Sequence, residues 1–182
     1  MSKKAKIRLR VLIFSALLAA MGVLLGQYLS IKIGDSIRIG FGALPVILAG
    51  ALFGPWVGLL VGAISDIVGC AIFYGLGNLI PLVTLGMMAE GFLAGVIAKR
   101  KTPARLVLAT VSARAVGSLL LRSLGLYLRY KTPLITLLIR VPCVAVESVL
   151  ISLFLIYLLC HSTALTRAVK GWQKEDSRHD DV

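Results

Sequence analysis

Charged residues are scarce in this chain of 182 residues: only 15% are Asp, Glu, Lys or Arg, while 58% are hydrophobic. A soluble domain typically carries about 25% charged residues and about 45–50% apolar ones. The mean hydropathy of +0.93 departs from that pattern in the same direction. So few charges cannot cover a water-facing surface, which excludes an ordinary soluble enzyme and a disordered protein. The length allows about six membrane spans of roughly 20 residues with short connections.

Signatures of self-contained catalysis are also missing from the sequence. It holds no glycine-rich loop with a phosphate-binding lysine, no HExxH and no GxSxG motif, and its two histidines, His161 and His179, follow the last apolar segment. The three cysteines lie in apolar runs without CxxC spacing, which is typical of small buried residues. We therefore expect neither an enzyme nor a bound cofactor or metal. If the protein acts in uphill transport, its energy source is elsewhere.

Six apolar segments are present, and we predict a membrane-spanning helix in each: residues 11–29, 40–54, 56–74, 82–98, 106–128 and 134–160. The second segment has only 15 residues and includes Pro45. As a helix it measures about 22 Å, against a hydrocarbon core of about 30 Å. Irregular backbone at membrane depth survives only where protein or a cavity satisfies it. We expect this segment to be short, tilted or irregular within one all-α, six-transmembrane-helix bundle.

Basic residues gather on one predicted side of the membrane. They are concentrated in residues 1–10, 99–105 and 167–178, whereas the opposite connections hold Lys32, Arg38, Arg129 and Lys131. Because cytoplasmic loops carry an excess of Lys and Arg, we predict cytoplasmic termini and a multi-pass protein of the cell membrane. The same clustering explains the net charge of +12 without a nucleic-acid partner. The predicted organisation is a basic cytoplasmic N-terminus, a six-helix transmembrane domain and a cytoplasmic polar tail, at residues 1–10, 11–160 and 161–182.

Six ionisable residues lie inside the predicted spans: Asp66, Glu90, Arg114, Arg122, Arg140 and Glu147. Each costs about 2.5–3.5 kcal/mol to insert at the centre of a bilayer, so each needs a physical reason. Ion pairing between helices is the structural explanation, because it lowers the desolvation penalty. We favour that explanation for Glu90, Arg114 and Glu147, which fall near the middle of their spans.

The remaining intramembrane charges fall nearer the outer surface. Arg122 and Arg140 lie in the outer halves of their spans, Asp66 lies somewhat outward of centre, and Arg38 precedes the short second segment. We expect them to converge on a net-positive outward-facing chamber that suits an anionic ligand, because Arg offers paired donors to a carboxylate. Further candidates on the same side are Phe73, Tyr74, Asn78 and Tyr127. An interfacial aromatic belt is the alternative explanation for the rings.

Ala16 and Ala20 form a small-xxx-small pair in the first span. Such spacing lets two helix backbones approach closely. The pair serves either packing inside the bundle or docking of another membrane protein, and the residues alone leave both possibilities open.

Several stretches resemble a known family: SIKIGDSIRIG (residues 30–40), FGALPVILAGALFGP (41–55), WVGLLVGAISD (56–66), LLLRSLGLYLRYKTP (119–133) and LIR (138–140). Together they resemble the substrate-binding S components of energy-coupling factor (ECF) vitamin transporters. Within that superfamily the chain is most similar to the folate-type, FolT-like members.

This resemblance implies a six-helix subunit that captures its vitamin from outside. It would hand the vitamin to a transmembrane T component and two cytoplasmic ATPase subunits. In the family an AxxxA pair on the first helix contacts the T component, which maps here to Ala16 and Ala20. Folate would place its carboxylates at Arg38, Arg122 and Arg140, and its pterin amino and N–H groups at Asp66. Arg122 and Gly125 stand where folate-type members are expected to carry Asn and Trp.

Three other functions remain open from the sequence. An S component for pantothenate or a pyridoxine-like vitamin keeps the family and changes the ligand. A six-span scaffold such as an MreD-like cell-shape protein needs no charged chamber. An ion-coupled secondary transporter typically has paired broken helices, whereas this sequence offers a single short segment.

Overall fold

The structure is a computed structural model that describes residues 3–33, 37–98, 103–130 and 134–161. Its helices are α1 (Lys3–Gln27), α2 (Ala43–Phe53), α3 (Pro55–Phe73), α4 (Pro81–Ile97), α5 (Pro103–Arg114), α6 (Ser123–Tyr130) and α7 (Leu134–His161), with a π-helix η2 (Ala115–Arg122) and a 3₁₀ turn η1 (Leu76–Asn78). Since α5, η2 and α6 follow one another without a gap, they form one long helical segment. The described residues therefore hold six helical segments, at the positions expected for the six spans.

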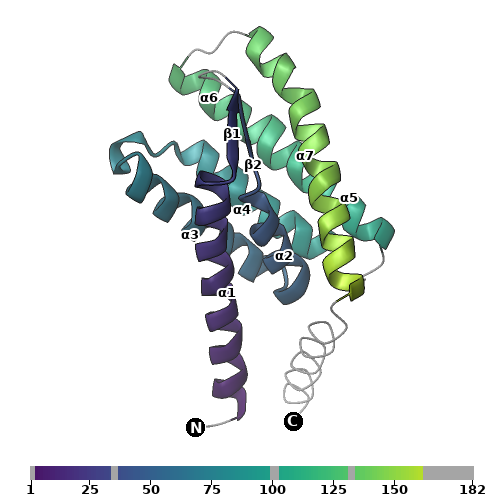
Figure 1. Ribbon diagram of the computed structural model, residues 1–182. Helices are drawn as coiled ribbons and strands as arrows, with labels where there is room; N and C mark the ends of the chain where they lie inside the picture. Colours follow the sequence, from purple (N-terminus) through teal and green to yellow (C-terminus); the bar gives the residue numbers. More distant parts are fainter. Residues whose placement is uncertain (1–2, 34–36, 99–102, 131–133, 162–182) are drawn as a thin grey trace.

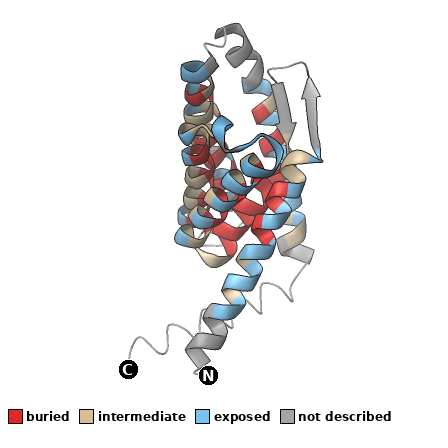
Figure 2. Ribbon diagram, turned by 90° about the vertical axis from the view of Figure 1, so that its left-hand side faces the viewer, coloured by how far each residue is buried: buried red, intermediate tan, exposed pale blue. Residues whose placement is uncertain are grey.

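The short helix α2 lies at the centre of the bundle. Every residue from Ala43 to Leu52 is buried, and Figure 2 shows the buried residues gathered in the middle of the molecule. Because neighbouring helices surround α2, it does not need the length of a lipid-exposed span. This arrangement explains a segment of only 11 residues that contains Pro45 near its start. Of the short, tilted or irregular forms that we expected, the structure shows a short helix enclosed by protein.

Glycines bring α2, α3 and α4 into backbone contact. A methyl group on Gly58 would overlap the backbone of Gly91, and one on Gly91 would overlap the backbone of Gly58. Gly50 of α2 approaches the same part of α4. Packing through small residues is the usual way in which membrane helices gain close van der Waals contact. Gly50, Gly58 and Gly91 therefore serve packing inside the bundle.

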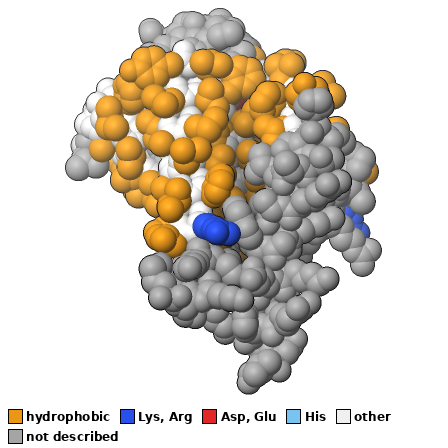
Figure 3. Space-filling model, turned by 60° about the horizontal axis from the view of Figure 1, so that its bottom comes forward, with side chains coloured by type: hydrophobic (Ala, Val, Ile, Leu, Met, Phe, Trp, Pro, Cys, Tyr) orange, Lys and Arg blue, Asp and Glu red, His pale blue; other side chains and the backbone are white. Residues whose placement is uncertain are grey.

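Four helical stretches among the described residues are long and apolar enough to cross a membrane: Leu9–Gln27, Pro55–Phe73, Ala104–Arg129 and Val141–Leu158. The helices α2 and α4 are apolar but shorter. Large apolar side chains stay exposed on the outside, such as Leu12, Leu60, Ile72 and Leu153. Figure 3 shows hydrophobic side chains over most of the described surface on one face. These features are those of a membrane protein, and a count of six spans remains a prediction.

Residues 30–33 and 37–40 form a hairpin of two paired strands where we expected only a polar loop. Strands β1 (Ser30–Ile33) and β2 (Ile37–Gly40) pair antiparallel, with Ile31 opposite Ile39 and Lys32 opposite Arg38. Isoleucine alternates with polar residues on both strands, which is the period-2 pattern of a strand. The bundle is helical as predicted, and this hairpin is an addition that an all-α description lacks. The hairpin lies at the end of the bundle opposite the first turn of α1 and the last turn of α7 (Figure 1).

Candidate substrate-binding site

A cavity of about 530 Å³ opens among the helices. Its wall includes residues of α1, α3, α4, η2 and α7, together with Gly40 at the end of β2 and Gly42 before α2. Ligand pockets in proteins usually measure about 300–1,000 Å³, so the cavity is large enough for a vitamin-sized molecule. The predicted chamber inside the bundle is therefore present as a void that small residues such as Gly22 and Gly26 help to leave open.

Four of the predicted site residues line this cavity: Asp66, Tyr74, Asn78 and Arg122. Asp66 accepts a hydrogen bond from the Thr84 hydroxyl at 2.7 Å, which links α3 to α4 and orients the carboxylate. The Tyr74 hydroxyl donates to Gln27 Oε1 at 3.2 Å and so joins the ends of α3 and α1. Asn78 Nδ2 donates to the Tyr74 carbonyl at 2.7 Å. The structure thus gathers these polar groups on one void, from segments far apart in sequence.

Two predicted aromatics are not part of the cavity wall. Phe73 is 39% exposed and packs edge-on against Tyr28, with ring centroids 5.8 Å apart. Tyr127 is 46% exposed, whereas its neighbour Leu126 lines the cavity. Successive residues on a helix differ by about 100° in direction, so the residue beside a wall residue points elsewhere. The structure therefore leaves both rings out of the described cavity wall, and their contact with a ligand stays a prediction.

The side chains of Arg38 and Arg140 lie outside the described residues. Their backbones are placed in β2 and α7. Their contact with a ligand therefore remains a prediction.

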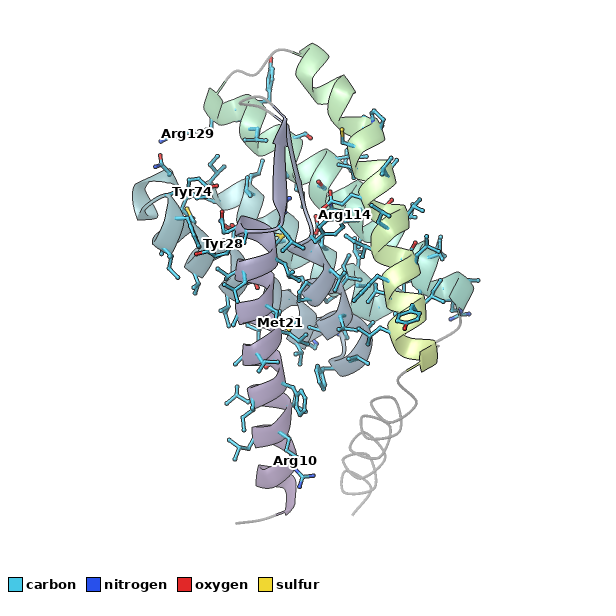
Figure 4. All side chains as sticks on the ribbon, viewed as in Figure 1. Arg10, Met21, Tyr28, Tyr74, Arg114 and Arg129 are labelled. Carbon is cyan, nitrogen blue, oxygen red and sulfur yellow. The ribbon has the colours of Figure 1, made fainter. Side chains whose placement is uncertain are left out.

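An ion cluster adjoins the cavity and consists of Glu90, Arg114, Arg122 and Glu147. Arg114 is buried between two carboxylates, with its Nη1 3.3 Å from Glu90 Oε2 and its Nη2 paired with Glu147 Oε2. Arg122 Nη2 lies 3.9 Å from Glu90 Oε1. Figure 4 shows Arg114 in the interior beside α7, far from Arg10 near the start of α1. The ion pairing predicted for Glu90, Arg114 and Glu147 is confirmed, and it ties α4, α5 and α7 together.

The cluster changes the expected charge of the chamber. Among the described wall residues, the carboxylates of Asp66 and Glu147 match the guanidiniums of Arg114 and Arg122 in number. A net-positive chamber is therefore not what these side chains form. Position along the chain showed that Glu147 lies at mid-span, but not that it faces the same void as Arg122.

Sequence reasoning missed Arg114 and Glu147 as wall residues, since it gave them a purely structural role. One signal in the sequence could have indicated that these residues meet: opposite charges lie at similar depth on different predicted spans. Gln27 also lines the cavity and accepts a hydrogen bond from the Tyr74 hydroxyl. Gly125 packs against Leu82, whose Cβ lies 2.9 Å from where a methyl group on Gly125 would sit, so α6 has no room there for a tryptophan.

The fold and the cavity define a helical membrane protein with an internal cavity large enough for a small solute. The sequence comparison makes the class specific. Residues 10–161 match the family model described as ECF transporter, substrate-specific component, and the chain belongs to that family. This membership favours a transporter subunit over an enzyme, an MreD-like scaffold or an ion-coupled secondary transporter.

Individual relatives are similar over different shares of the chain. The folate transporter FolT of Clostridium novyi (strain NT) is 36% identical over 89 residues, which cover 49% of this chain and 51% of that protein. The match thus spans about half the length of this curated relative.

Two solved structures share the fold. A crystal structure of FolT bound with folic acid superposes with a TM-score of 0.70 at 23% identity, covering 81% of this chain and 90% of the other. The S component of a bacterial ECF transporter gives a TM-score of 0.66 at 22% identity, covering 85% and 95%.

Proposed function

We propose that this protein captures folate, or a folate-like anionic vitamin, from outside the cell for ATP-driven uptake. The observation that carries the proposal is the cavity of about 530 Å³ that places Asp66 and Arg122 in one wall. The partial similarity to a FolT protein supports the same ligand class.

The chemistry of the wall suits the two ends of such a molecule. A pterin ring presents amino and N–H donors, which the Asp66 carboxylate accepts while Thr84 holds it in place. The carboxylates of the glutamate moiety pair with Arg122, whose side chain keeps 21% of its surface exposed and lies only at the edge of the ion cluster. Tyr74 and Asn78 offer further hydrogen bonds near the same wall. Arg38 and Arg140 add cations for the second carboxylate in this proposal.

The proposed partners are a transmembrane T component and two cytoplasmic ATPase subunits. Ala16 and Ala20 are both exposed on α1, as a docking face requires and as packing inside the bundle does not. Small residues on an exposed helix face let a partner helix approach closely. We place the protein in the plasma membrane with both termini cytoplasmic, because the basic residues gather at those ends.

Pantothenate or a pyridoxine-like vitamin is the second candidate ligand. The observation in its favour is that Gly125 packs tightly against α4 where a folate-type member is expected to carry Trp. A smaller ligand needs fewer aromatic contacts.

Binding to the purified, detergent-solubilised protein tests the proposal. The panel is folic acid, pantothenate and pyridoxine, read by ligand-induced thermal shift and by isothermal titration calorimetry. We expect folic acid to stabilise the protein most. Asp66→Asn and Arg122→Gln should each weaken its binding at least about tenfold, because a hydrogen bond to a charged group contributes about 1.5–3 kcal/mol. Ser112→Ala is the control, since that hydroxyl bonds the Leu108 carbonyl of its own helix.

If pantothenate or pyridoxine binds more strongly than folic acid, that vitamin replaces folate as the proposed ligand. Unchanged folic acid affinity in both Asp66→Asn and Arg122→Gln removes the pocket assignment.

A further inference from the structure

Glu147 of α7 presents an unused acceptor to the cavity. The residue is 3% exposed and belongs to the cavity wall. One carboxylate oxygen, Oε2, pairs with Arg114, while Oε1 is buried without a hydrogen-bond partner. Leaving a buried polar group unsatisfied costs about 1–3 kcal/mol, and more for a charged one. Native proteins rarely keep such a group without a reason, and a bound ligand is one such reason.

Glu90, the other carboxylate of the ion cluster, is used differently. It is fully buried and is not a wall residue. Both of its oxygens accept from Arg114 Nη1, at 3.4 and 3.3 Å, and Arg122 lies 3.9 Å away. Both oxygens of Glu90 therefore bond Arg114, whereas Glu147 pairs with Arg114 through Oε2 only.

The pairing with Arg114 also restricts the Glu147 carboxylate. Arg114 contacts Glu147 through Nη2 and Glu90 through Nη1, so the contact that orients Glu147 is separate from the contact with Glu90. Because all three side chains are buried, they have little freedom to reorient. An acceptor held in place before the ligand arrives loses little entropy on binding.

We propose that Glu147 Oε1 is a specificity-determining acceptor that takes a hydrogen bond from an N–H or O–H group of the bound vitamin. A ligand that uses both groups carries an anionic group, which pairs with Arg122, and an N–H or O–H donor, which bonds Glu147 Oε1. A buried acceptor rejects analogues without a donor strongly, because they leave it unpaired. This inference rests on the proposed function of the cavity as the substrate site.

The test compares Glu147→Gln with Glu90→Gln. Both changes remove one charge from the ion cluster, but only the first alters a wall residue. The binding of folic acid, pantothenate and pyridoxine is measured by titration calorimetry, and the stability of the ligand-free protein is measured by thermal unfolding. We expect Glu147→Gln to weaken the best ligand at least about tenfold, as loss of a charge-assisted bond predicts, and Glu90→Gln to weaken it less than threefold at comparable stability.

A second variant guards against misfolding. Glu147→Asp keeps the charge next to Arg114 but withdraws the oxygen from the cavity by one methylene, so it should also weaken binding about tenfold. Equal affinities in the wild-type, Glu147→Gln and Glu147→Asp proteins overturn the inference about Glu147 and leave the proposed function standing. Equal weakening in Glu147→Gln and Glu90→Gln also overturns it, because a structural role then suffices. If the wild-type protein binds none of the three vitamins, the proposed function and this inference fail together.

Discussion

Replacing Arg114 by methionine is the sharpest test of the ion cluster. The change removes a fully buried guanidinium and leaves the carboxylates of Glu90 and Glu147 facing each other, with Arg122 3.9 Å from Glu90 as the cation that remains nearby. Removing one partner from a buried ion pair typically costs about 3–5 kcal/mol. Here one cation serves two carboxylates, so we expect the loss to lie at the upper end of that range. Native proteins are stable by only about 5–15 kcal/mol, so the loss is a large part of the total.

The assay is unfolding of the ligand-free protein in mixed micelles of mild detergent and dodecyl sulfate, followed by loss of helical circular dichroism. The matched control is the triple variant Glu90→Gln, Arg114→Met, Glu147→Gln, which removes the three buried charges together and leaves only the partly exposed Arg122. Replacing a buried ion pair by uncharged groups is often neutral or stabilising, so the triple variant should recover most of the stability that the single variant loses. If Arg114→Met is as stable as the wild type, or if the triple variant is no better than the single one, the cluster does not hold the helices as described.

Three further predictions concern packing, docking and the cavity wall. Gly91→Leu should destabilise the bundle by about 1–3 kcal/mol or more in the same unfolding assay, because its side chain meets the backbone of α3, whereas Gly77→Ala, which meets open space, should have little effect. The double substitution Ala16→Trp, Ala20→Trp should abolish co-purification with the T component and spare vitamin binding; survival of the complex refutes the docking face. Thr84→Val should weaken folic acid binding severalfold in calorimetry by releasing the Asp66 carboxylate, and unchanged affinity would show that Asp66 needs no such support.

The positions of the helices follow from the sequence because their apolar runs are long and their breaks are strong. Pro55 and Pro81 stand at the first positions of α3 and α4, where a missing backbone N–H has no cost. The hairpin at residues 30–40 was harder to foresee, since each strand has only four residues. Strands that short give few repeats of the alternating pattern, and the charges of Lys32 and Arg38 favour a loop just as well.

The candidate site was predictable in depth but not in direction. A helix rises about 1.5 Å per residue, so counting from the span ends places Asp66 and Arg122 at similar levels. Direction around the helix depends on which neighbour each face meets. The π-helix η2 adds a further obstacle, because its wider turn shifts the faces of the residues within it and after it, including Arg122 and Tyr127. Nothing in the local sequence indicates that widening.

The balance of charge in the cavity has a physical rationale. Uncompensated arginines at membrane depth would each carry a desolvation penalty in the ligand-free protein. Pairing Arg114 with two carboxylates removes most of that penalty, while Arg122 stays at the edge of the cluster, where its side chain is still 21% exposed. Under the proposed function, a vitamin with a carboxylate and several donors would pair with Arg122 and satisfy Oε1 of Glu147. A plain anion without donors would pair with Arg122 but leave that oxygen without a partner.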